Sequence, residues 1–196
     1  MTRPAATQRS KARADLRAPG LPGEAPVDRS DVPPAIPRAF GMAAFAMNRF
    51  IVDQTLRAAR QFDNDIEAMT LFGVLAHLNV AHLMPPGTRP SQALNAQGRL
   101  PDLPGRMRPI RLRDLCQITG RPRETVRRKL LQLQAQGRVR RLAAGYVYDA
   151  ACVDAPMREL ATDGVRRFLA TAEQIGALLR DAEQALGPAS ARPRSR

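Results

Sequence analysis

The hydrophobic residues between positions 38 and 62 recur at the spacing of an α-helix. One stripe is formed by Phe40, Ala44, Met47, Ile51, Ala58 and Phe62. Phe45 and Val52 widen this stripe, so the segment carries more apolar surface than one small domain needs. The pattern predicts an amphipathic helix that packs against other helices of this chain or of a second copy.

The next segment, which ends at the prolines at positions 85 and 86, is apolar on almost every side. Its apolar residues are Ile66, Met69, Leu71, Phe72, Val74, Leu75, Leu78, Val80 and Leu83. Asn64 and Glu67 have the N-cap and N3 spacing of a capping box at its start. A helix without a polar face is typical of a protein interior, so we expect residues 38–84 to form a helical core or dimerisation region.

Residues 85–108 contain five prolines and three glycines, which predicts a long loop. Asp154 and Pro156 then predict the start of a helix over residues 154–187, and Gly164 is expected to break or bend it. Beyond Gly164, apolar residues alternate at spacings of three and four, as in the a/d seam of three heptads: Val165, Phe168, Ala172, Ile175, Leu179, Ala182 and Leu186. We expect this seam to be a homodimer interface; the alternative is packing against the chain's own N-terminal helices.

Residues 109–150 have the pattern of two short helices and a hairpin. The first helix has apolar residues on one side, and the second has one buried stripe; these residues are Leu112, Leu115, Cys116 and Ile118, followed by Val126, Leu130 and Leu133. Gly120 suits a left-handed turn between the helices, Pro122 suits the start of the second helix, and Gly137 ends it. Two helices joined by such a turn form a helix-turn-helix.

After Gly137 the chain reads as strand, turn and strand. Val139 and Leu142 lie before the turn, Gly145 supplies a turn position, and Tyr146, Val147 and Tyr148 follow it. A helix-turn-helix followed by a two-stranded hairpin is a winged helix. The expected fold is therefore mainly α: a winged helix-turn-helix flanked by N-terminal helices and by a long C-terminal dimerisation helix.

Charge is concentrated in this predicted winged helix. The chain of 196 residues has a net charge of +13, and residues 109–149 alone contain ten basic and three acidic residues. A localised positive patch is typical of a protein that binds a polyanion. Only two of the 31 basic residues are lysines, which genome composition can explain, but composition bias does not explain why the excess clusters.

The buried stripe on the second helix, expected over residues 122–136, turns its arginines outward. Residues near the start of such a helix reach base edges in the major groove, where Arg pairs with guanine and Glu accepts from cytosine. We expect Arg123, Glu124 and Arg128 to read bases. The expected contacts to the DNA backbone, including those from the wing over residues 138–148, are Arg121, Thr125, Arg127, Lys129, Arg138, Arg140 and Arg141.

The run "GRPRETVRRKLLQLQAQGRV" from Gly120 resembles the recognition helix of the catabolite activator protein/Fnr superfamily, whose pattern is G-x-S-R-E-T-V-x-R-x-L-x-x-L. In that family the first Arg, the Glu and the second Arg read bases, which implies this role for Arg123, Glu124 and Arg128. The resemblance also implies that Thr125 lies near a phosphate. It covers residues 110–149, about a fifth of the chain. The order of the predicted elements is similar to that of MarR-type dimeric regulators, in architecture alone.

The chain departs from the superfamily's pattern in three ways. Pro122 replaces the usual Ser, and Arg138 stands where an apolar residue is usual. No segment upstream resembles the superfamily's cyclic-nucleotide-binding β-roll, so the resemblance implies no cofactor. Whether a small-molecule effector binds is left open.

An enzyme is not expected, because all five serines fall in predicted tails or the loop. His77 and His82 are five residues apart, which does not aim both at one metal, and we expect them to be ordinary buried or interface residues, with ligand sensing as the alternative. Cys116 and Cys152 are expected to be small buried apolar residues. Neither a signal peptide nor a membrane span is expected, which favours the cytoplasm and the nucleoid.

The expected function is that of a homodimeric, sequence-specific regulator of transcription that binds double-stranded DNA. The alternatives are a winged helix that serves protein–protein interaction or assembly, and a DNA-binding replication or partition protein. Residues 1–37, which contain seven prolines, and residues 188–196 are expected to be a disordered arm and a basic tail.

Overall fold

The computed structural model describes residue 33 and residues 35–85, 87–96, 98 and 100–185. The predicted arm and the basic tail therefore lie largely outside the described residues, except that the first helix already begins within the predicted arm. The elements in order are α2 (Ile36–Arg60), α3 (Ile66–Val80), η2 (Ala81–Leu83), α4 (Pro90–Ala93), α5 (Leu103–Arg106), α6 (Leu112–Thr119), α7 (Arg123–Ala135), β1 (Val139–Leu142), β2 (Gly145–Tyr148), η3 (Ala150–Cys152) and α8 (Ala155–Gln184).

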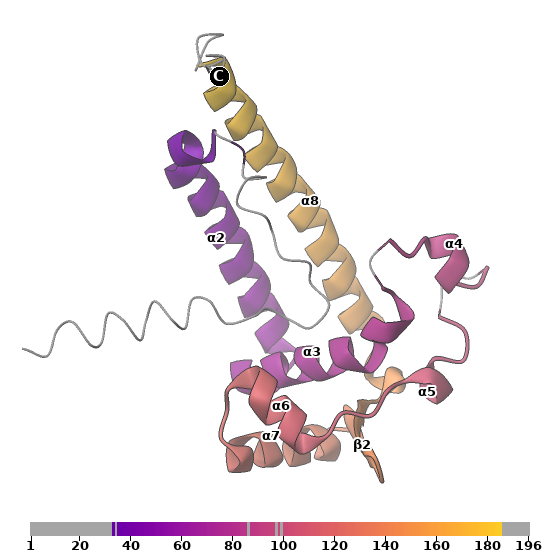
Figure 1. Cartoon of the computed structure of the whole chain (residues 1–196). Helices are drawn as coiled ribbons and strands as arrows, with labels where there is room; N and C mark the ends of the chain where they lie inside the picture. The colour runs from indigo at the N-terminus through magenta and orange to yellow at the C-terminus, as the bar shows by residue number, and fades with distance from the viewer. Residues whose placement is uncertain (1–32, 34, 86, 97, 99, 186–196) are drawn as a thin grey trace, which may run out of the picture.

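The elements form two regions (Figure 1). Helices α2 and α8 lie side by side and antiparallel, and we call this pair the stem. Helix α3 crosses the base of the stem, and α6, α7 and the β1–β2 hairpin pack against it; we call these elements the module. The expectation of a mainly helical chain with a two-stranded hairpin and a long C-terminal helix is confirmed.

The module has a continuous hydrophobic core. Its largest fully buried apolar side chains come from three helices: Leu75 of α3, Leu115 of α6, and Val126, Leu130 and Leu133 of α7. Phe72 of α3 adds ring contacts with Phe62 and with Tyr148 of β2. The stripe predicted for α7 is therefore the side by which this helix is held to the module.

Helix α3 begins one residue later than the capping box predicted. Asn64 has a left-handed backbone with φ 61°, and the carboxylate of Asp65 accepts a hydrogen bond from the backbone N–H of Ala68 at 3.0 Å. Asp65 is thus the N-cap, so the prediction of Asn64 was wrong by one position. The shift places Glu67 in the first turn, where it pairs with Arg121 instead of reaching back to the cap.

Two glycines fix the geometry of the module's turns. Gly120 ends α6 with φ 64°, the left-handed conformation that the sequence predicted. Gly145 opens β2 with φ 152°, and a Cβ there would lie 2.5 Å from the carbonyl oxygen of Ile110. Ile110 and Tyr146 exchange two backbone hydrogen bonds, so the segment before α6 pairs with β2 and leaves room only for glycine.

The stem packs through small and polar residues. Gly164 is the only buried residue of α8, and α2 buries only Ala39, Ala46 and Ala59. Helix α8 is continuous, so the expected break at Gly164 was wrong: the helix passes close to Gln54 of α2 at this point. Further contacts are an ion pair between Arg167 and Asp53 and a ring contact between Phe50 and Phe168.

The predicted seam of α8 lies only partly against α2. Val165, Phe168 and Ala172 are exposed, Ile175, Leu179 and Ala182 are half-buried, and Leu186 lies outside the described residues. The chain's own α2 thus covers one side of α8, the alternative that the sequence left open. Residues 85–108 contain the short helices α4 and α5 within the predicted loop.

Candidate nucleic-acid interface

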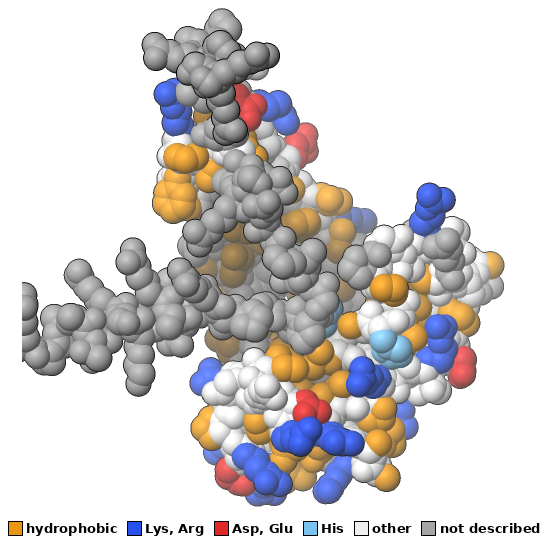
Figure 2. Space-filling model, viewed as in Figure 1, with side chains coloured by type: hydrophobic (Ala, Val, Ile, Leu, Met, Phe, Trp, Pro, Cys, Tyr) orange, Lys and Arg blue, Asp and Glu red, His pale blue; other side chains and the backbone are white. Residues whose placement is uncertain are grey.

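Helix α7 has two distinct sides. Val126, Leu130 and Leu133 are buried in the module, whereas the opposite side exposes basic residues to solvent. The exposed side carries Arg123, Glu124, Arg127, Arg128 and Leu131. In Figure 2 the blue side chains of Lys and Arg gather over the end of the molecule where α6 and α7 lie. The helix is rigid, because one of its sides is buried in the module. Its exposed arginines can therefore dock against a binding partner with little loss of conformational entropy.

Glu124 and Arg127 form a two-pronged ion pair within this exposed side. The guanidinium of Arg127 donates from Nε and Nη2 to the two carboxylate oxygens at 2.8 and 2.6 Å. The hydrogen bond from Arg127, together with the charges of Arg127 and Arg128, lowers the pKa of Glu124 below its ordinary value. Glu124 is therefore an acceptor held in place by Arg127, one helical turn away.

Arg123 and Arg128 are exposed, and within the described part of the chain neither is in an ion pair. They stand next to the Glu124–Arg127 pair on α7. The structure thus brings together the three residues expected to read bases, and it leaves the two arginines available to an external partner.

Three of the residues expected to contact the DNA backbone lie instead near α3, on α7 and in the turn before it: Arg121, Thr125 and Lys129. The ammonium group of Lys129 pairs with Asp65, and its side chain is only 15% exposed. Gln132 donates to the same carboxylate at 3.2 Å. Arg121 lies 3.4 Å from Glu67, and Thr125 is half-buried beside it. Lys129 in particular joins α7 to the start of α3 through Asp65, and it does not extend over the exposed side of α7.

The arginines of the hairpin divide in the same way. Arg138 donates to the backbone oxygen of Gln61 and lies 4.5 Å from the centre of the Phe62 ring, so it connects the start of the hairpin to the turn between α2 and α3. Arg140 and Arg141 are exposed on β1, and Arg140 pairs with Asp149 at 3.2 Å. The hairpin therefore offers Arg140 and Arg141 to a partner, and it uses Arg138 internally.

Asn79 is a positioning residue that the sequence did not reveal. It is fully buried, and its amide donates to the carbonyls of Arg108 and Tyr146 at 2.7 and 3.1 Å. Its side-chain oxygen accepts from the backbone N–H of Tyr148 at 2.9 Å. Asn79 thereby fixes both β2 and the segment before α6 to α3. The only signal in the sequence was one amide near the end of a mostly apolar helix.

Two other expectations concern metals and membranes. Among the described residues, no group of three or more His, Cys, Asp or Glu is placed to hold a metal ion. By length and composition alone, the segment Ile66–Leu83 is apolar enough to cross a membrane, in contrast to the expectation from sequence. This segment is the one on which α6, α7 and β2 pack, which accounts for its apolar character.

No family model matches this chain, and comparisons with curated proteins and with solved structures find no match either. The features of the molecule that bear on function are an exposed basic side of α7, two exposed arginines on the neighbouring strand β1, and a buried network that holds both elements.

Proposed function

We propose that the module is a winged helix-turn-helix that binds double-stranded DNA in a sequence-specific manner and regulates transcription. The observation that supports this most strongly is the exposed side of α7. It presents Arg123 and Arg128 from a helix whose opposite side is locked in the core. In this proposal α7 enters the major groove, and the hairpin β1–β2 is the wing. The protein then acts at the nucleoid, in the cytoplasm.

Each group on α7 has a chemical role in this proposal. Arg123 and Arg128 donate paired hydrogen bonds to guanine, the commonest specific contact in the major groove. Glu124, held by Arg127, accepts from the amino group of cytosine. A carboxylate on a surface that binds a polyanion lowers non-specific affinity, so its presence favours sequence reading. Arg140 and Arg141 contact phosphates or the minor groove from the wing.

The alternative with specific support is a platform for protein–protein interaction. Leu131, which is 48% exposed on the same side of α7, would suit an apolar partner. The arginines around it favour DNA, since like charges on one surface oppose burial against a protein. A replication or partition protein would use the same contacts to DNA, and it differs in what it recruits.

The test of DNA reading compares three variants by selecting bound sequences from random DNA and by titration at several salt concentrations. We expect Arg123→Ala to weaken the preferred site by about 1–3 kcal/mol and to relax one position of the motif. Arg140→Ala should weaken all sequences equally and reduce the salt dependence. Arg166→Ala, which removes one exposed charge from α8, is the control for net charge. Equal losses on preferred and random DNA for Arg123→Ala would refute base reading.

We also propose that the protein binds DNA as a homodimer and that the stem forms the dimer interface. Large apolar side chains remain exposed on both stem helices, and orange side chains lie along the stem in Figure 2. They are Phe40, Met42, Phe45, Met47, Ile51, Val52, Leu56, Val165, Phe168 and Leu169. Half-exposed side chains of this size add up to on the order of 1,000 Å², close to the ~800 Å² per partner of a standard interface.

The position of these residues supports a second copy as the partner. Phe40, Met47 and Ile51 form one stripe of α2, and Phe45, Val52 and Leu56 form another with the same spacing. Helix α2 therefore has apolar surface well beyond the side that α8 covers. A bundle made from two stems buries this surface, and it places two α7 helices for a site with two-fold symmetry.

Sedimentation tests the dimer. We expect the wild-type protein to be a dimer at micromolar concentration, and Ile51→Asp or Leu169→Asp to shift it to a monomer. Met84→Asp, which changes a similarly exposed apolar residue outside the stem, should leave the dimer intact. A monomeric wild-type protein would contradict the proposal whatever its affinity for DNA.

A further inference from the structure

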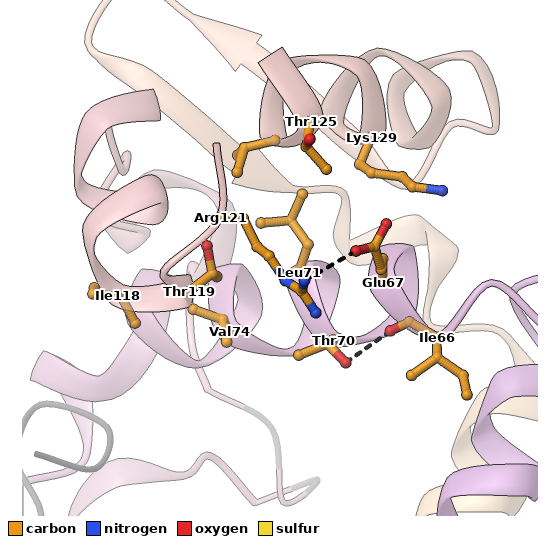
Figure 3. A pocket seen from close by; sticks show the side chains of 11 residues that line it. Ile66, Glu67, Thr70, Leu71, Val74, Ile118, Thr119, Arg121, Thr125 and Lys129 are labelled. Atoms are coloured by element: carbon orange, nitrogen blue, oxygen red, sulfur yellow. Dashed lines mark hydrogen bonds and ion pairs between the residues drawn. The ribbon is translucent and has the colours of Figure 1, made fainter. Parts of the chain in front are cut away.

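A cavity of about 330 Å³ lies between α3, α6 and the first turns of α7 (Figure 3). Its walls come from all three helices and from the turn that joins α6 to α7. It thus lies directly behind the helix side proposed to read DNA. A cavity of this size is at the lower end of the range for small-molecule sites.

The body of the cavity is apolar. Leu71 and Val74 of α3 and Val126 of α7 form its walls, together with Ile66 and Ile118 at its edges. Ile66 and Ile118 are 50% and 37% exposed, unlike the fully buried Leu75 and Leu115 of the same two helices. An apolar group that entered the cavity would therefore remove surface from water on two helices, which favours binding.

The polar groups that line the cavity are two cations, one carboxylate and three hydroxyls: Arg121, Lys129, Glu67, Thr70, Thr119 and Thr125. The side chain of Arg121 extends across it in Figure 3 and reaches Glu67 by a single contact of 3.4 Å. Lys129 enters from α7, and its ammonium group is already paired with Asp65. A guanidinium has five N–H donors, so Arg121 retains donors after the long contact with Glu67. Thr70 and Thr119 donate their hydroxyls to backbone oxygens of their own helices.

We propose that this cavity binds a small amphipathic carboxylic acid. The apolar part lies between Leu71, Val74 and Ile118, and the carboxylate takes a two-pronged pair of hydrogen bonds from Arg121 in place of the contact with Glu67. Paired bonds between a guanidinium and a carboxylate are stronger and more directional than one long contact. The volume admits a molecule of roughly a dozen non-hydrogen atoms, on the basis of ~30 Å³ per water molecule. A single ring or a short chain with one carboxylate fits this limit.

Binding at this place is coupled to α7, a consequence that rests on the proposed function. Thr125, Val126 and Lys129 line the cavity from α7, and Arg121 lies in the turn before it. A carboxylate held by Arg121 adds a negative charge beside the first turn of α7, so the acid lowers affinity for DNA. By linkage, DNA lowers affinity for the acid by the same factor.

The binding test uses the full chain without DNA, so its result is independent of the proposed function. Calorimetry and methyl NMR compare phenylacetate and hexanoate with the uncharged phenylacetamide and hexanamide and with the cation phenethylamine. We expect the two acids to bind at millimolar concentration or below and to shift the methyl signals of Val74 and Ile118. The amides should bind about tenfold more weakly, and the amine should not bind. Absence of binding by both acids, or equal binding by acids and amides, would overturn the proposal.

Three variants locate the site. Arg121→Gln should weaken the acids about tenfold and leave the amides unchanged, whereas Arg113→Gln, on the outside of α6, should change neither. Thr70→Phe fills the cavity and should abolish binding of acids and amides, while circular dichroism and the melting temperature verify its fold. If Thr70→Phe does not fold, the methyl shifts in the wild-type protein decide alone. Shifts confined to the stem would show binding elsewhere and would overturn the proposal.

Discussion

The module and the stem are built from similar helices, yet only the module completes its core within one chain. Leu75, Leu115, Leu130 and Leu133 are fully buried in the module. In α2 and α8 no large side chain is fully buried: the buried residues of the two helices are Gly164 and three alanines. The stem instead exposes large residues such as Phe40 and Phe45, at 63% and 68%.

This difference shows what each region requires for its stability. The module excludes water from its leucines and gives hydrogen bonds to both polar atoms of the fully buried Asn79 side chain, although the side-chain oxygen of Gln134 on α7 is buried without a partner. The stem combines small residues inside with large apolar residues outside, the reverse of the arrangement that stabilises two isolated helices. Its apolar surface is consistent with a helical bundle that a second stem completes.

Two adjacent leucines of α7 should differ most in their effect on stability. Leu130 is fully buried and Leu131 is 48% exposed, so they share a helix and differ in burial. We expect Leu130→Ala to lower the free energy of unfolding by about 2–5 kcal/mol, because it leaves a cavity in a packed core. Leu131→Ala should change it by less than about 0.5 kcal/mol. Urea unfolding measures both, and comparable losses would contradict the position of α7.

A second, smaller effect concerns Asn79 and the connection between α3 and β2. Asn79→Leu keeps the volume but leaves the carbonyl of Arg108 and the N–H of Tyr148 without this partner, while the carbonyl of Tyr146 keeps only its bond from the N–H of Ile110. We expect a loss of roughly 2–4 kcal/mol in unfolding free energy, since each buried unpaired group is costly. Gln117→Leu, on the exposed side of α6, should be almost neutral. Faster hydrogen exchange at Tyr146 and Tyr148 in the Asn79 variant would locate the damage in the hairpin; unchanged exchange there would argue against this role.

Local patterns predicted the module well. The spacing of Val126, Leu130 and Leu133 predicted the buried side of α7, and Gly120 predicted its turn, because both follow from the geometry of a single helix or turn. Arg138 and Lys129 were assigned to DNA from their charge, whereas the structure pairs them with α3 and its N-terminal loop. Partners 64 and 77 residues away cannot be read from local spacing, since only the tertiary fold brings them close.

The partner of α8 in the stem could not be predicted from the sequence. A heptad seam shows that α8 needs a partner, but the seam does not say which helix supplies it. The structure places α2 there, and it also shows that α8 is continuous at Gly164, where it passes close to Gln54 of α2. The sequence around Gly164 does not tell whether this glycine breaks the helix or lets another helix come close. Only the position of Gln54 in the structure distinguishes the two roles.

The smallest effect concerns the ion pair that joins α7 to α3. Burial would raise the pKa of Asp65, but hydrogen bonds from Lys129, the Ala68 N–H and Gln132 outweigh it, so the pKa lies below its ordinary value of 3.8. A carboxyl with a lowered pKa contributes stability above its unfolded-state pKa, and this contribution is lost as pH falls through the folded-state pKa. We expect Asp65→Asn to lower stability by about 1 kcal/mol at neutral pH. The difference in stability from the wild-type protein should close as pH falls below 3.8.

Asp114→Asn, which removes an exposed pair with Arg113, is the control and should cost only a few tenths of a kcal/mol. Urea unfolding between neutral and acidic pH measures the gap, and a gap that persists in acid would show that Asp65 acts through its cap geometry and not through its charge.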